Sequence, residues 1–257
     1  MNPRYEKKRY ALVLAAGESR RFKSATPKVA YPLCGKPILS HVLDKLENLD
    51  IEKTFVVVGP ESLSVKDAVA SYAVSFVVQE EPLGTGHAVM AAAPLLKDFS
   101  GSLLVLCGDA PLITTKTLRQ LLETQEVKDA DQVILTATLE DPQGYGRIIR
   151  DRQGNAVDIV EEKDARPDQR AIREINTGFH CFKISSILEE VSQLSPANAA
   201  QEYYLTDLLR IFCGHGKKVV TLATDDPDET RGINDLEQLA WAERALKDRQ
   251  QTTDNKQ

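Results

Sequence analysis

The sequence predicts a doubly wound α/β fold: a mixed sheet, mainly parallel, with helices on both faces and an antiparallel hairpin extension. In the first half, short Val- and Leu-rich runs bounded by Gly alternate with amphipathic stretches. This alternation is typical of buried parallel strands joined by right-handed crossover helices. After about residue 130 the apolar runs become shorter, and Gly-containing turns separate them. Short apolar runs separated by such turns indicate β-hairpins.

The first half predicts strands and helices in strict alternation. The expected strands are residues 10–15, 54–59, 74–78 and 102–107. The expected helices are residues 36–49, 61–71, 85–97 and 114–125. Ligands of such sheets bind beyond the carboxyl ends of the strands, so the segments that follow the runs are the candidates for binding.

The second half predicts the antiparallel part and three closing elements. Hairpin-like strands lie in "DQVILTATL" (131–139), in the segment 144–165 and in "INTGFHCFKI" (175–184). A helical stretch over 195–216, a strand over 217–224 and a helix over 234–248 follow, with Asn234 at a plausible N-cap. We expect the polar end after residue 248 to fray.

Bulk composition excludes several classes of protein. The 257 residues are 42% hydrophobic and 27% charged, with a net charge of -6. No apolar stretch approaches the roughly 18–20 residues that span a bilayer, and no secretory leader is evident, so we expect a cytoplasmic protein that does not bind membranes. The acidic balance argues against nucleic-acid binding. Four single cysteines without metal spacing indicate reduced packing residues.

A cationic loop follows the first strand. "AAGESRRFKSATPK" (15–28) contains Arg20, Arg21, Lys23 and Lys28, but it matches neither the Walker A pattern nor G-x-G-x-x-G. Small residues at a strand end with several cations nearby could hold a polyphosphate. A solvated cationic loop is an equally good interpretation, and composition alone does not decide between them.

Two other strand ends carry polar groups. Gly84, Thr85 and Gly86 precede an Ala-rich helix, where backbone donors and the helix dipole favour an anion, although Thr85 could simply cap that helix. Asp109 follows a wholly apolar strand. With phosphates present, a carboxylate at that position favours Mg²⁺ over a turn cap.

Eight motifs in order resemble a known family. They are "LAAGESRRF…PK", "QEEPLGTGHAV", "GDAPL", "GYGRI", "VEEKDA", "EINTGF", "EYYLTD" and "GINDLEQL", and they span about residues 9–245. This series is similar to the sugar-nucleotide pyrophosphorylases of the nucleotidyltransferase superfamily, most of all to the uridyltransferase domain of bacterial bifunctional N-acetylglucosamine-1-phosphate uridyltransferases. The resemblance implies a Rossmann-like fold of the nucleotide-diphospho-sugar transferase type. It implies one domain over 1–250, with a nucleotide-binding half (about 9–130), a sugar-binding half (about 131–245) and a polar tail (251–257).

The resemblance also implies the reaction. A sugar 1-phosphate oxygen attacks the α-phosphorus of UTP with the help of Mg²⁺, which forms UDP-N-acetylglucosamine, a cell-wall precursor, and releases pyrophosphate. No covalent enzyme intermediate is needed, and the sequence shows no nucleophile paired with a base. Catalysis of this kind depends on positioning two polyanions and stabilising charge.

Site residues follow from the resemblance, motif by motif. The catalytic cations are Arg21 on the triphosphate and Lys28 near the reacting phosphates, and the Mg²⁺ ligands are Asp109 and Asn234. Nucleotide-binding residues are Leu14, Ala15, Ala16, Gly17, Gln79, Gly84 and Thr85. Sugar-binding residues are Gly146, Glu161, Asn176, Tyr204 and Thr206.

The chain departs from the family pattern at three places. Ser19 and Arg20 replace the Gly and Thr of the family loop, and Cys107 stands where an aromatic residue often occurs. The hexapeptide-repeat acetyltransferase domain of the bifunctional relatives is not in this sequence. We therefore expect uridylyl transfer alone, a monomer or small homo-oligomer, and a separate acetyltransferase partner for any acetylation.

Three alternatives stay open at this point. The enzyme could use another sugar 1-phosphate or another nucleotide by the same mechanism. A catalytically silent regulator that binds a sugar nucleotide is the second, although the metal ligands and Lys28 argue against it. A nicotinamide dehydrogenase is disfavoured by the absent G-x-G-x-x-G.

Overall fold

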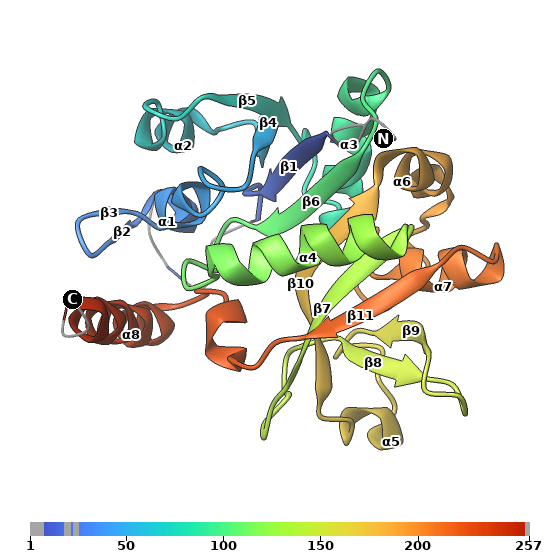
Figure 1. Ribbon diagram of the computed structural model, residues 1–257. Coiled ribbons are helices and arrows are strands. Elements are labelled where there is room, and N and C mark those ends of the chain that lie inside the picture. The colour runs from blue at the N-terminus through green and yellow to red at the C-terminus, as the bar shows by residue number, and fades with distance from the viewer. Residues whose placement is uncertain (1–7, 18–21, 23–25, 255–257) are drawn as a thin grey trace, which may run out of the picture.

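A mixed sheet of nine strands forms the centre of the protein (Figure 1). The computed structural model describes residues 8–17, 22 and 26–254. Seven strands form the main path in the order β11-β7-β10-β6-β1-β4-β5. They are β1 (Arg9–Leu14), β4 (Ile51–Val58), β5 (Val74–Val78), β6 (Ser102–Cys107), β7 (Gln132–Thr138), β10 (Glu174–Lys183) and β11 (Val219–Ala223). The strands β8 (Arg147–Arg150) and β9 (Ala156–Val160) leave this path as a hairpin, and β2 (Pro32–Leu33) pairs with β3 (Lys36–Pro37) in a separate small sheet.

Parallel pairing dominates one side of the sheet. Strands β6, β1, β4 and β5 are parallel neighbours, as are β7 and β11. Strand β10 runs antiparallel to both β6 and β7, and the β8–β9 hairpin joins β10 through Arg147 and Ile175. The predicted fold class is confirmed. The antiparallel part is more than an extension, however, because β10 lies in the middle of the sheet.

Helices cover both faces of the sheet (Figure 1). They are α1 (Ile38–Asp44), α2 (Leu63–Ala68), α3 (Thr85–Leu96), α4 (Thr115–Lys128), α5 (Pro167–Arg170), α6 (Ile184–Glu190), α7 (Asp207–Gly214) and α8 (Leu236–Asp254), with 3-10 turns η1 (Lys28–Ala30), η2 (Val191–Gln193) and η3 (Pro227–Thr230).

Alternate residues of β1 pack into two different hydrophobic cores, one on each face of the sheet. Ala11 and Val13 pack with α1, α2 and α4, whereas Tyr10 and Leu12 pack with α3, α6 and α7.

Several helix boundaries differ from the prediction. The stretch 195–206 is not helical, and α7 begins only at Asp207, because the backbone around Tyr203 pairs with the 83–86 loop. Helix α6 was not predicted. The last helix continues to Asp254 instead of fraying after residue 248. Within the described ranges, no helix is both long and apolar enough to cross a membrane.

Candidate active site

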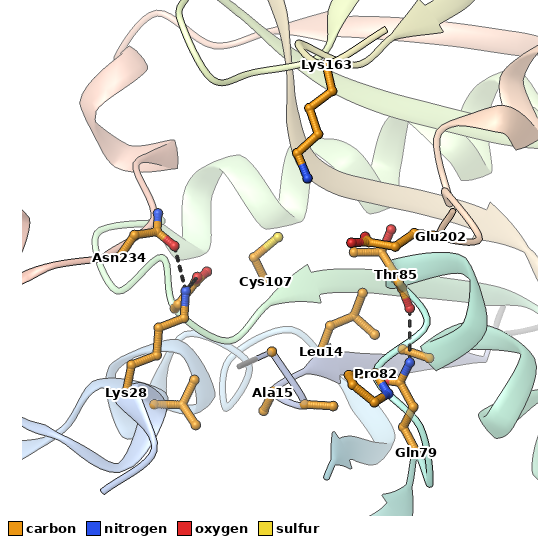
Figure 2. A pocket seen from close by; sticks show the side chains of 16 residues that line it. Leu14, Ala15, Lys28, Gln79, Pro82, Thr85, Cys107, Lys163, Glu202 and Asn234 are labelled. Carbon is orange, nitrogen blue, oxygen red and sulfur yellow. Dashed lines mark hydrogen bonds and ion pairs between the residues drawn. The ribbon is translucent and has the colours of Figure 1, made fainter. Parts of the chain in front are cut away.

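A cavity of about 610 Å³ opens at the carboxyl ends of β1, β5 and β6 (Figure 2). This is the edge at which doubly wound sheets bind ligands. Ten residues predicted from the sequence line it: Leu14, Ala15, Ala16, Gly17, Lys28, Gln79, Gly84, Thr85, Asp109 and Asn234. The predicted nucleotide-side and metal-side residues therefore share one cavity.

One wall of the cavity brings Lys28, Asp109 and Asn234 together. The Lys28 ammonium donates to Asp109 Oδ2 and to Asn234 Oδ1, the latter at 2.8 Å. Asp109 stands just beyond the end of β6, and its carbonyl accepts a hydrogen bond of 2.8 Å from the Ile233 N–H. That backbone bond joins two segments far apart in sequence and sets Asn234 beside Asp109.

Asp235, not Asn234, caps helix α8. The Asp235 carboxylate accepts from the Gln238 N–H at 2.8 Å, and Gln238 Oε1 accepts from the Asn234 N–H at 2.7 Å. The predicted N-cap role of Asn234 is therefore wrong, because the next residue already satisfies the helix. As a result the Asn234 side chain can turn toward the cavity and accept from Lys28.

The oxygens of Asp109 and Asn234 suit a hard cation. They already converge on a positively charged group, the Lys28 ammonium. In the part of the chain that the structure describes, no three His, Cys, Asp or Glu side chains form a metal cluster. A site with one carboxylate and one amide oxygen fits Mg²⁺, which usually keeps water and substrate oxygens as its other ligands.

The opposite wall is built by the loop at the start of α3. Gly84 has a φ of 103°, and a Cβ at Gly84 would lie 2.7 Å from the Tyr203 carbonyl oxygen. The Gly86 N–H donates to that carbonyl at 2.8 Å, and the Tyr203 N–H donates to the Leu83 carbonyl at 2.7 Å. The glycines thus allow a close backbone contact. The expectation of a free anion donor is wrong at Gly86, whose N–H is already engaged.

Thr85 and Gln79 hold the same wall in place. Thr85 Oγ1 accepts from the Leu205 N–H at 3.2 Å, and Gly84 rather than Thr85 is the N-cap. The buried Gln79 amide donates to the Gly84 carbonyl at 3.1 Å, and its Nε2 lies 3.1 Å from His87 Nδ1. Both side chains therefore stabilise the loop whose surface faces the cavity.

Four of the predicted sugar residues, Gly146, Glu161, Asn176 and Thr206, form a cluster beside the cavity. Thr206 Oγ1 donates to Glu161 Oε1 at 2.9 Å. A Cβ on Gly146 would lie 3.1 Å from the same oxygen, and the Asn176 N–H donates to the Gly146 carbonyl at 2.8 Å. Glu202 lines the cavity and lies in the same loop as Thr206, so the cluster adjoins the cavity.

Burial raises the pKa of three groups in this region. Desolvation raises the pKa of Glu161 above its usual range, and the nearby Asp164 carboxylate adds to the effect. Desolvation also raises the pKa of Tyr204, again with a contribution from Asp164. Cys107 lines the cavity, and burial raises the pKa of its thiol to about 12, so it is a neutral wall residue.

Some site residues differ from those predicted. Arg21, together with Ser19 and Arg20, lies outside the described residues. Lys163 was missed, although Figure 2 shows it pointing into the cavity across from Lys28. It lies two residues after Glu161 and three after the end of β9, so its place beside a predicted site residue is a signal that could have identified it.

A family model matches most of the chain. The MobA-like NTP transferase domain covers residues 11–177. Two similar solved structures are UDP-glucose pyrophosphorylase complexed with UDP-glucose, at a TM-score of 0.76 and 18% identity, and CMP:2-keto-3-deoxy-manno-octonic acid synthetase complexed with CTP, at 0.68 and 16%. Each match covers 94% of this chain and 99% of the other chain. At such identities the likeness shows the fold alone.

Curated relatives match over nearly the whole chain. "Bifunctional protein GlmU" of Geobacillus thermodenitrificans is 46% identical over 242 residues, which are 94% of this chain and 52% of the relative. The same-named protein of Bacillus subtilis is 43% identical, over 94% of this chain and 53% of the relative. The chain thus spans about half the length of these relatives. By its match over residues 11–177, the chain belongs to the MobA-like NTP transferase domain family.

Proposed function

We propose that this chain transfers the uridylyl group of UTP to N-acetylglucosamine 1-phosphate, forming UDP-N-acetylglucosamine and pyrophosphate. The observation that carries the proposal is the convergence of Lys28, Asp109 and Asn234 on one wall of the cavity. The 46% identity to a bifunctional relative over 94% of this chain supports it. Two proteins of similar fold have been solved with ligands of the proposed chemical class, UDP-glucose and CTP.

In this mechanism, a phosphate oxygen of the sugar 1-phosphate forms a bond to the α-phosphorus of UTP. The bond between that phosphorus and the α,β-bridging oxygen breaks, and pyrophosphate leaves with the electron pair. Both reactants are polyanions, so positioning and charge stabilisation supply most of the rate acceleration. Lys28 and Lys163 would offset repulsion between the phosphates from two sides of the cavity. We assign Arg21 the same task toward the triphosphate.

Asp109 and Asn234 would hold Mg²⁺, which neutralises phosphate charge when bound. The nucleoside would lie along Leu14 to Gly17 and against the wall formed by Gln79, Gly84 and Thr85. The sugar would meet the Glu161 cluster. We also propose a cytoplasmic enzyme, with acetylation of the substrate supplied by another domain or protein.

A substrate panel tests this function. Pyrophosphate release is measured with UTP, CTP, GTP and dTTP, each combined with N-acetylglucosamine 1-phosphate or glucose 1-phosphate. We expect kcat/KM to be at least about tenfold higher for UTP with N-acetylglucosamine 1-phosphate, because buried polar groups discriminate by this amount or more.

Two outcomes would contradict the proposal. Turnover of glucose 1-phosphate without turnover of N-acetylglucosamine 1-phosphate would assign the enzyme to another sugar. Binding of UDP-N-acetylglucosamine without any pyrophosphate release, under conditions that saturate Mg²⁺, would identify a silent regulator instead.

A further inference from the structure

Arg147 has an unusual environment for a charged residue. Its side chain is 2% exposed, and it does not line the cavity. Nη2 donates to Glu162 Oε2 at 2.7 Å, and Nη1 donates to the Tyr145 carbonyl. Nε is buried and has no partner among the described residues. Because burying a guanidinium is expensive and this one is incompletely paired, stability alone does not account for it.

The register of the β8–β9 hairpin places this ion pair next to the sugar cluster. Arg147 pairs with Val160, which puts Gly146 opposite Glu161. Val160 is the last residue of β9, and Glu162 lies in the turn just beyond it, where its carboxylate accepts from Arg147. Each member of the ion pair directly follows a member of the sugar cluster in the sequence: Arg147 follows Gly146, and Glu162 follows Glu161.

Glu162 also organises the turn before β8. The carboxylate oxygen that binds Arg147 accepts a hydrogen bond of 3.1 Å from the Gly144 N–H. Gly144 has a φ of 86°, so this turn relies on a left-handed residue at that point. One carboxylate thus holds both the turn over 142–145 and the guanidinium of the next strand.

The close approach of Gly146 to Glu161 depends on this arrangement. A Cβ at Gly146 would lie 2.9 Å from Ile159 Cγ2 and 3.1 Å from Glu161 Oε1, so little clearance exists between the strands. A change of strand separation or register would move Glu161 relative to Gly146 and Asn176. A displacement of that kind alters recognition of a substrate much more than it alters the core.

We propose that Arg147 and Glu162 are a positioning pair that fixes the sugar-reading groups Gly146, Glu161 and Asn176 without touching the substrate. This rests on the proposed function, because it assigns the cluster to the sugar. Loss of the pair should therefore weaken binding of the sugar and leave binding of the nucleotide intact.

The chain offers a matched control on the same strand. Arg150 donates through Nε and Nη2 to Glu174 at 2.7 and 2.6 Å, which ties β8 to the start of β10. This pair is a bidentate Arg–Glu contact, whereas Arg147 donates to Glu162 through Nη2 alone, and it lies at the other end of β8 from Gly146. Arg150→Met removes a comparable interaction away from the cluster.

The test compares binding of UDP-N-acetylglucosamine and of UDP by titration calorimetry, together with KM values for both substrates. For Arg147→Met we expect affinity for UDP-N-acetylglucosamine and KM for the sugar phosphate to worsen about tenfold, with UDP and UTP changed less than about twofold. Arg147→Lys should recover part of the loss, and Arg150→Met should leave all four values near those of the wild type.

Equal losses for UDP and UDP-N-acetylglucosamine, or no loss for either, would overturn the proposal. If Arg147→Met does not fold, Glu162→Gln answers the same question, because its side chain is 29% exposed and keeps an acceptor. A wild-type protein that binds UDP-N-acetylglucosamine no more tightly than UDP would contradict the proposed function itself, before any variant is made.

Discussion

Glu161 carries the clearest electrostatic penalty in the site. Its carboxyl group has one hydrogen-bond partner among the described residues, the Thr206 hydroxyl. Burial raises its pKa, and Asp164, Asp207 and Glu202 add to that shift. A carboxyl whose pKa is higher in the folded than in the unfolded state stabilises the protein at low pH. That stabilisation is lost as pH rises through the folded pKa.

Glu161→Gln should therefore stabilise the protein while it impairs sugar recognition. Near pH 7 we expect Tm to rise by about 2–4 °C, the usual response to about 1 kcal/mol in a domain of this size. The gain should shrink as pH falls, because the wild-type carboxyl then becomes neutral as well. Tm measured for both proteins between about pH 4 and pH 8 checks this. A gain that does not vary with pH would contradict the assignment.

Asp109→Asn and Asn234→Ala test the wall of the cavity that contains Lys28. We expect each to lower kcat at least about a hundredfold, since charge stabilisation at the reacting phosphorus is the main catalytic term. UTP binding in the absence of divalent ions should change much less. Turnover of Asp109→Asn that equals the wild type in Mg²⁺ would show that this carboxylate is not a metal ligand.

Strand ends made the residues of the cavity partly predictable. A polar group directly after a buried strand, as at Asp109, must face the ligand edge, and this geometry is set by local sequence. Asn234 was harder to place, because its orientation depends on Asp235 taking over the helix cap. Lys163 was missed because its relation to Lys28 exists only across the folded cavity.

Among the elements, the loop before α3 differs most between its predicted role and its role in the structure. From the sequence, Gly84, Thr85 and Gly86 allowed two interpretations: an anion-binding helix start, or an ordinary helix N-terminus capped by Thr85. Instead, the loop pairs with the backbone of Tyr203 and Leu205. That pairing also explains why residues 195–206 do not continue α7, since these residues make bonds to another segment. Periodicity could not reveal it, because the partner segment is more than 100 residues away.

Thr85→Val tests this link between the two loops. The Leu205 N–H would lose its acceptor, and an unpaired buried donor costs about 1–3 kcal/mol. We expect a lower Tm and faster hydrogen exchange at the Leu205 amide. Thr85→Ser keeps the hydroxyl and is the matched control. Equal exchange rates in both variants would show that the hydroxyl does not hold the loop.

At the scale of the whole molecule, alternation of strands and helices was enough to predict the α/β class. It could not predict that β10 would lie between β6 and β7, because the neighbours of a strand are chosen by tertiary packing. Helix α8 is likewise a tertiary element. Its residues cover Phe22, Leu33 and Ile38, and Arg249 donates to the Leu112 carbonyl at 2.6 Å.

Ending the chain at Asp235 should damage both stability and activity. The variant loses the cover of that apolar cluster and the Gln238 acceptor for the Asn234 N–H. We expect a large fall in Tm and, in any folded protein, a lower kcat. Removal of residues 255–257 alone is the control and should change neither. Full activity without α8 would show that Asn234 needs no such support.

The central place of β10 also governs how the chain can fold during its synthesis. Strands β6 and β7 leave the ribosome well before residues 174–183, which form hydrogen bonds with both of them. At about 5–20 residues per second, the nascent chain spends several seconds with open apolar strand edges. Such edges are sites of misassembly. Newly made chains should therefore depend on chaperone binding until β10 has emerged, and slower translation of this region should lower the soluble yield.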